Sequence, residues 1–265
     1  MIIFFDFYVF IIGLIIGSFL NVCISRLPKG ESVLYPPSHC TTCGNKLKPI
    51  ELIPVLSYIM LKAKCKNCNE KISIRYPIIE VLTAIVYAII FSRFGLSINF
   101  FAALFLMTIL IVVFFIDLDH QIIPDELVIT GLVGSVALIL YIVFTSQPVF
   151  EEASWLAHLL GALPGSGLLF LVALIGLVIF KSEEVMGMGD VKIFLPIGIF
   201  LGWKLCIFTM LISIVLAGLI SIALVIFRLK KRKDTIPFGP FIVAGTFVAL
   251  IWGNQILHWY IGMCF

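Results

Sequence analysis

The chain has 265 residues, of which 62% are hydrophobic and only 12% are charged, and its mean hydropathy is +1.18. Soluble domains are about half apolar and about a quarter charged, so this composition excludes an ordinary soluble globular protein and indicates a lipid bilayer as its surroundings. The formal net charge of +3 is explained by basic residues gathered in two loops, and it requires no nucleic-acid partner.

The expected fold is an all-α polytopic membrane protein with about eight transmembrane helices. A helix needs about 20 mostly apolar residues to cross a bilayer. The runs that satisfy this lie near 3–24, 77–93, 98–116, 126–145, 156–180, 190–203, 205–227 and 237–257. The sixth run is short, and its boundary with the seventh falls around Gly202. The first run carries Asp6 and no A-x-A site, so we interpret it as a membrane helix rather than a cleaved signal peptide.

Basic residues predict the orientation of these spans. Nine of the 18 lysines and arginines fall in 25–76, and five more fall in 228–233. Positively charged loops stay on the cytoplasmic side of a membrane. The loop 25–76 and the loop around 228–233 are therefore expected in the cytoplasm, with both chain termini outside.

Loop 25–76 carries four cysteines, Cys40, Cys43, Cys65 and Cys68, as CTTC and CKNC separated by 21 residues. A two-residue gap lets both sulfurs of a pair face one ion, so the pattern favours a four-thiolate zinc site. Two disulfides are the alternative, but a cytoplasmic loop is kept reduced. A zinc ion held by four thiolates has no open coordination position, so its expected role is structural.

The middle of this loop, PIELIPVLSYIML (49–61), is apolar. It fits either a short helix lying in the membrane interface or a small packed core for the loop.

Carboxylates at span ends are the candidate catalytic groups. Asp190 follows Gly187 and Gly189 at the start of the sixth span, where a helix N-cap is the structural interpretation. Asp117 ends the third span, where the helix dipole disfavours negative charge. Helix capping therefore does not explain an acid at this position, and another role is expected. Asp125 reads as an ordinary helix start, and Asp119 is expected on a different face from Asp117.

If Asp117 and Asp190 meet, the two carboxylates share one proton because both cannot ionise cheaply side by side. The ionised member then takes a proton from water while the other donates to a carbonyl, which is aspartyl protease chemistry. The two glycines would leave room for a substrate backbone at Asp190. A cation site of an ion-coupled transporter and a zinc-binding assembly subunit without chemistry are the alternatives. A transporter site would lie near the bilayer midplane, whereas both acids lie at span ends.

Several ordered motifs resemble one family. They are GSFLNVCISRLP (17–28), the two cysteine pairs, ISIRYPIIEVLTA (72–84), IDLDHQIIPD (116–125) and GMGDVK (187–192). Together they resemble the bacterial type IV prepilin peptidases, the GxGD membrane aspartyl enzymes also described as leader peptidase/N-methyltransferases.

This resemblance implies that Asp117 and Asp190 are the catalytic pair, with the site facing the cytoplasm in the bacterial cytoplasmic membrane. It implies cleavage of type IV prepilins and pseudopilins after the glycine that ends a basic leader. It also implies N-methylation of the new N-terminal residue from S-adenosylmethionine. The expected division is a first helix (1–24), a methyltransferase-associated zinc loop (25–76) and a peptidase core (77–265).

Two features remain without a role at the level of sequence. No Gly-rich fingerprint for binding S-adenosylmethionine is present. Glu80 places an acid just inside the second span, where it is either functional or a carboxylate that reaches back to the interface.

Overall fold

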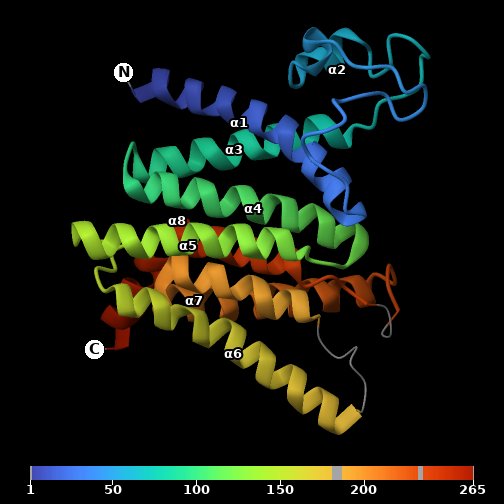
Figure 1. The fold of residues 1–265 in the computed structure, drawn as a ribbon. Helices are drawn as coiled ribbons and strands as arrows, with labels where there is room; N and C mark the ends of the chain where they lie inside the picture. Colours follow the sequence, from blue (N-terminus) through green and yellow to red (C-terminus); the bar gives the residue numbers. More distant parts are fainter. Residues whose placement is uncertain (1, 181–186, 232–234, 265) are drawn as a thin grey trace. The chain divides into compact units, whose positions relative to one another are not determined.

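The structure is a computed structural model that describes residues 2–180, 187–231 and 235–264 (Figure 1). Its long helices are α1 (Ile2–Arg26), α3 (Arg75–Phe94), α4 (Ile98–His120), α5 (Asp125–Thr145), α6 (Trp155–Phe180), α7 (Met188–Ile226) and α8 (Gly239–Cys264). These seven are long and apolar enough to cross a membrane. No β-strand occurs in the described ranges. The predicted all-α, multi-span fold is confirmed.

Helix α7 accounts for two of the eight predicted spans. Its 39 residues would extend about 58 Å as a straight helix, nearly twice the thickness of the bilayer core. Gly202 interrupts it with φ 76° and ψ 167°. A Cβ added at Gly165 would lie 2.9 Å from Phe194 Cγ and 3.1 Å from Cys206 Sγ. Twelve residues of straight helix would separate those two side chains by about 18 Å, so the chain reverses at Gly202.

The reversal gives a short sixth span and a longer seventh, as the sequence predicts. The predicted boundary around Gly202 is the residue with the non-helical backbone. Its φ and ψ lie in a region that is essentially restricted to glycine.

The chain forms two compact units, residues 1–100 and 101–265. In the first unit, α1 and α3 pack as an antiparallel pair. A Cβ added at Gly13 would lie 2.5 Å from Ala84 Cα, and one at Gly17 would lie 2.7 Å from Glu80 Cα. Glycines four residues apart thus let the two backbones approach closely, which is a common way of packing helices in membranes.

The loop between α1 and α3 contains three short helices, η1 (Leu27–Lys29), η2 (Pro49–Leu52) and α2 (Leu56–Met60). Neither η2 nor α2 contains a buried residue. Ile59 is 63% exposed and Met60 is 70% exposed. The packed-core interpretation of 49–61 is therefore wrong, because its apolar side chains are not enclosed. A position in the membrane interface stays a prediction.

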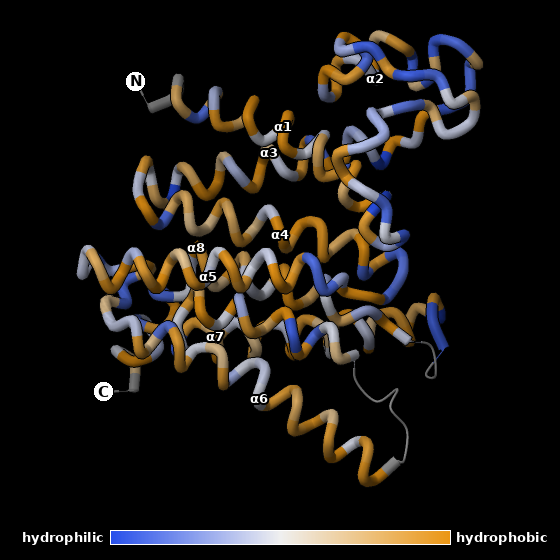
Figure 2. Tube along the Cα trace, in the orientation of Figure 1, coloured by the Kyte–Doolittle hydropathy of each residue, from blue (hydrophilic) through white to orange (hydrophobic). Residues whose placement is uncertain are grey.

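The second unit is built around α7, which packs most extensively against α6 and α8. The first half of α7 also meets α4. The rings of Phe105 in α4 and Phe200 in α7 stack with their centroids 5.8 Å apart. Leu110 and Ile116 of α4 and Ile193 and Ile197 of α7 are fully buried. Figure 2 shows apolar residues along all the long helices, while hydrophilic residues concentrate in the connections, above all between α1 and α3. This distribution suits helices surrounded by lipid.

Candidate active site and candidate metal centre

The four predicted ligands, Cys40, Cys43, Cys65 and Cys68, lie together in the first unit. Their Sγ atoms all lie within 4.8 Å of one another. Cys40 Sγ and Cys68 Sγ are 3.8 Å apart. Tetrahedral zinc with Zn–S bonds of about 2.3 Å requires sulfur–sulfur separations of about 3.8 Å. The donor set and its spacing fit a structural zinc ion.

Each cysteine pair forms the same tight turn. The amide of Gly44 donates to Cys40 O at 2.9 Å, and the amide of Asn69 donates to Cys65 O at 3.0 Å. Gly44 has φ 69° and Asn69 has φ 58°, in the left-handed region that glycine and asparagine tolerate best. The residue after each pair therefore closes the turn.

The turn also favours the thiolate form of Cys40. The backbone amides of Cys43 and Thr42 hydrogen-bond to its sulfur and lower the pKa of this thiol to about 6. Zinc binds the thiolate rather than the thiol. Desolvation and the neighbouring cysteine thiols raise the pKa of Cys68 to about 12, so of these two thiols only Cys40 favours the thiolate form without a metal.

Asp117 is held by the N-terminus of α8. It lies in the last turn of α4 and is 5% exposed. The backbone amide of Gly239, the first residue of α8, donates to Asp117 Oδ2 at 2.8 Å. The unfavourable dipole at the end of α4 is thus offset by the favourable one at the start of α8. This contact answers why an acid ends the third span.

Gly239 is a site residue that no local sequence motif marks. A Cβ at this position would lie 2.6 Å from Asp117 Oδ2 and 3.0 Å from Asp117 Cγ. Any side chain at position 239 would therefore displace the Asp117 carboxylate from the backbone amide, and only glycine avoids this. The available signal was topological, since the end of the third span and the start of the eighth are predicted on the same side of the membrane.

Asp190 lies in the first turn of α7, after the N-cap residue Gly187. The N-cap interpretation of Asp190 is therefore wrong by three positions, because the helix begins before it. Asp190 is half-buried, and repulsion from the charge of Asp117 acts on its carboxylate. The structure thus brings the two predicted aspartates into one electrostatic neighbourhood of the second unit.

The two aspartate motifs also touch directly. Lys192 Nζ lies 2.8 Å from Asp125 Oδ1, which joins GMGDVK to IDLDHQIIPD. A Cβ at Gly189 would lie 3.0 Å from Ile123 Cβ. Ile123 of this chain therefore occupies the space beside Gly189, whereas a Cβ at Gly187 would meet, among the described residues, only the Asp190 carboxylate, 3.2 Å from its Oδ2. That the two glycines leave room for a substrate at Asp190 stays a prediction.

Two further expectations about the first motif are confirmed. Helix α5 begins at Asp125, after Pro124 as N-cap residue. Asp119 is exposed whereas Asp117 is buried, so the two acids lie on different faces of α4.

Glu80 is buried in the first unit and belongs to neither aspartate motif. Its Oε2 accepts the backbone amide of Val55 at 2.8 Å, and the Ser18 hydroxyl also hydrogen-bonds to this carboxylate. Glu80 therefore connects α3 to α1 and to the start of α2. The Glu80 carboxylate is thus buried and hydrogen-bonded within the first unit, rather than simply extended toward the membrane interface.

Comparison with known proteins agrees with the two units. Residues 11–94 match the model of the bacterial peptidase A24 N-terminal domain, and residues 104–222 match that of the type IV leader peptidase family. No solved structure matches the chain.

Curated relatives match almost the whole length of the chain. A prepilin leader peptidase/N-methyltransferase of Bacillus subtilis is 34% identical over 96% of this chain and 97% of its own. Proteins with the same name from Aeromonas hydrophila (32% identity over 96% of this chain and 92% of that one) and Pseudomonas aeruginosa (30% over 95% and 91%) are also similar. The chain therefore belongs to the type IV leader peptidase family, whose members include the prepilin leader peptidase/N-methyltransferases.

Proposed function

We propose that this membrane protein removes the leader of type IV prepilins and pseudopilins after a glycine and then N-methylates the new N-terminal residue. Asp117 and Asp190 are the catalytic pair, and S-adenosylmethionine is the methyl donor. The observation that carries the peptidase assignment is that the two aspartate motifs lie in contact. Asp117 repels the Asp190 carboxylate, and Lys192 forms an ion pair with Asp125.

The surroundings of the two aspartates support different roles. Asp117 is buried, which disfavours its charge, but the Gly239 amide at the N-terminus of α8 donates a hydrogen bond to it, and this bond and the helix dipole offset part of that cost. Asp190, repelled by that charge, is then the member that keeps the shared proton. Asp117 accordingly takes a proton from the attacking water, and Asp190 donates its proton to the oxygen of the scissile carbonyl.

The proposed location is the bacterial cytoplasmic membrane, with the site facing the cytoplasm. The excess of lysine and arginine in loop 25–76 and near 228–231 supports this orientation. Asp117 and Asp190 lie at the ends of α4 and α7 that connect to short loops on that predicted side. They can therefore meet a cytoplasmic leader at the membrane surface.

Zinc is the proposed ion for Cys40, Cys43, Cys65 and Cys68. Four thiolates at this spacing suit zinc, and when bound the ion cross-links the two turns of the loop. Its role is to order loop 25–76, which we assign to methyl transfer, while 77–265 carries proteolysis.

The test is mass spectrometry of the N-terminus of a prepilin incubated in detergent with the purified protein and S-adenosylmethionine. The expected product starts directly after the leader glycine and carries one added methyl group. Omission of S-adenosylmethionine should give the same cleaved product without the methyl group. An uncut prepilin, or cleavage at another residue, would refute the proposal.

A further inference from the structure

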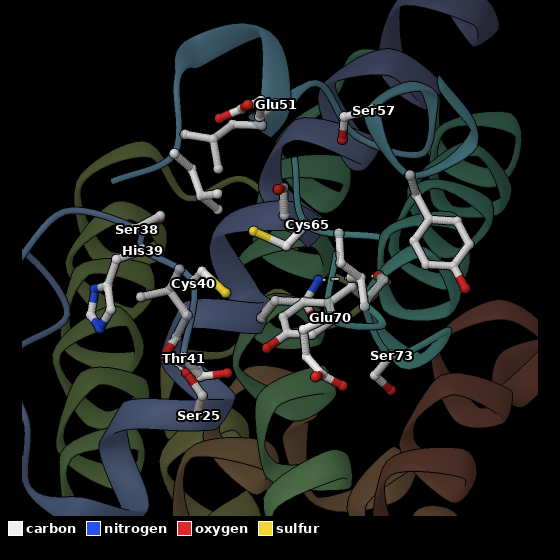
Figure 3. A pocket seen from close by; sticks show the side chains of 18 of the residues that line it. Ser25, Ser38, His39, Cys40, Thr41, Glu51, Ser57, Cys65, Glu70 and Ser73 are labelled. Atoms are coloured by element: carbon white, nitrogen blue, oxygen red, sulfur yellow. Dashed lines mark hydrogen bonds between the residues drawn. The ribbon is translucent and has the colours of Figure 1, made fainter. Parts of the chain in front are cut away.

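A cavity of about 570 Å³ lies in the first unit, between the cysteine turns and the loop ends of α1 and α3 (Figure 3). Among the lining residues that Figure 3 labels, Cys40 and Cys65 lie near the middle, Glu51 and Ser57 lie above them, and Glu70 and Ser73 lie below and to the right. Ser18, Asn21 and Glu80 line its helical floor. The cavity therefore adjoins the metal centre but extends well beyond it.

Its volume indicates a ligand larger than the ion. A zinc ion needs less room than one water molecule, which takes about 30 Å³. Small-molecule pockets are about 300–1,000 Å³. The cavity thus has the size of a site for a cofactor or a nucleoside-containing substrate.

The floor of the cavity is polar and fixed in place. Asn21 Nδ2 donates to Gly17 O and to Tyr76 O, each at 3.2 Å. Glu80 binds the amide of Val55 at 2.8 Å and the Ser18 hydroxyl. Asn21 and Glu80 are each 7% exposed. Buried polar side chains with this many partners hold a site rigidly.

The walls offer charges of both signs together with aromatic faces. The carboxylates of Glu31 and Glu70 have no hydrogen-bond or ion-pair partner among the described residues. Lys29 and Lys71 supply positive charge, and Tyr58 and Tyr76 supply rings.

This lining complements S-adenosylmethionine group by group. Carboxylates attract its sulfonium and ammonium charges and accept hydrogen bonds from ribose hydroxyls. A lysine pairs with its carboxylate, and an aromatic face suits both the adenine ring and the sulfonium.

We propose that this cavity is the S-adenosylmethionine site, with Glu70 as a ligand-contacting residue and Glu80 as a positioning residue. The proposal rests on the methyltransferase activity proposed above and assigns that activity to a place. The site combines α1, the loop and the start of α3, which explains why no continuous Gly-rich motif marks it.

The reaction at this site is a simple substitution. The uncharged α-amine exposed by leader cleavage attacks the methyl carbon. The carbon–sulfur bond breaks, and its electron pair goes to sulfur, which leaves as the neutral thioether of S-adenosylhomocysteine. The methylated ammonium then gives one proton to water.

The first measurement is binding of S-adenosylhomocysteine to the full-length protein in detergent by calorimetry. Glu70→Gln keeps the side-chain size, removes the charge and should weaken binding about tenfold or more. Glu151→Gln, an exposed glutamate of the second unit, is the matched control and should bind as the wild type does. Glu151→Gln should also leave the cleavage of prepilin unchanged.

The second measurement separates positioning from folding. Glu80→Gln retains an acceptor for Val55 and should keep most of the affinity, whereas Glu80→Ala should lose it. Photo-cross-linking of radiolabelled S-adenosylmethionine to the wild type should label peptides within residues 18–80. If the wild type methylates but the label is found outside residues 18–80, the cavity assignment alone is overturned. The same holds if the wild type methylates and Glu70→Gln binds S-adenosylhomocysteine with full affinity. A wild type that cleaves but neither binds nor methylates would overturn the proposed methyltransferase function as well.

Discussion

Gly239 donates its backbone amide to Asp117 Oδ2 at 2.8 Å, across 122 residues of sequence. A proposed catalytic acid is thereby fixed to the start of the last membrane helix. The contact tolerates no side chain at position 239, because a Cβ would lie 2.6 Å from the same oxygen.

Gly239→Ala is therefore expected to lower the turnover of prepilin cleavage about ten- to a hundredfold, because a hydrogen bond to a charged group contributes about 1.5–3 kcal/mol. The measurement is kcat on a prepilin peptide. Gly218→Ala is the matched control, since a Cβ there meets no atom within 4 Å. Equal turnover in both variants would show that the Gly239 contact does not matter to the reaction.

Removal of the thiolates tests the metal centre. Cys40→Ser and Cys65→Ser should each lose bound zinc, while Cys206→Ala, in α7, should retain it. Metal analysis of the purified proteins gives the result. Because the cluster lies in loop 25–76, the serine variants should lose methylation but retain leader cleavage. Unchanged zinc content would refute the ligand assignment, and parallel loss of cleavage would refute the division of activities.

Gly202→Ala tests the reversal within α7. The nearest atom to an added Cβ is 3.7 Å away, so the cost is conformational rather than steric. A non-glycine residue at φ 76° and ψ 167° should destabilise the protein by about 1–3 kcal/mol. Unfolding in detergent by denaturant measures this difference. A variant as stable as the wild type would mean that the chain does not turn back at Gly202.

The ion pair between Lys192 and Asp125 should contribute little to stability, although it joins the two motifs. Its side chains are 45% and 62% exposed, and exposed pairs contribute about 0–1 kcal/mol. A double-mutant cycle with Lys192→Met and Asp125→Asn should give a coupling energy in that range. A value above about 2 kcal/mol would indicate a pair that is shielded from water.

Local patterns predicted the parts of this protein that depend on local structure. The two cysteine pairs predicted the metal centre, because a two-residue gap lets both sulfurs of a pair face one ion. Apolar run lengths defined the spans, including the short sixth one, because the bilayer sets the length of a helix.

Tertiary partners were not visible in the same way. The role of Gly239 depends on α4 and α8 ending beside each other, and that of Glu80 depends on the path of the loop over α1 and α3. The contact between Gly189 and Ile123 was not visible either, because the two residues are far apart in the sequence. Close approach between distant segments is decided by packing, which a single sequence does not display.

Turnover of a prepilin peptide by Asp117→Asn and Asp190→Asn, each shown to fold by its unfolding midpoint, tests the catalytic pair most directly. General acid and base groups contribute about 10²–10⁴-fold each, so both variants should fall by at least about a hundredfold while still binding S-adenosylhomocysteine. Near-normal cleavage by either folded variant would contradict a mechanism in which Asp117 acts as the general base and Asp190 as the general acid.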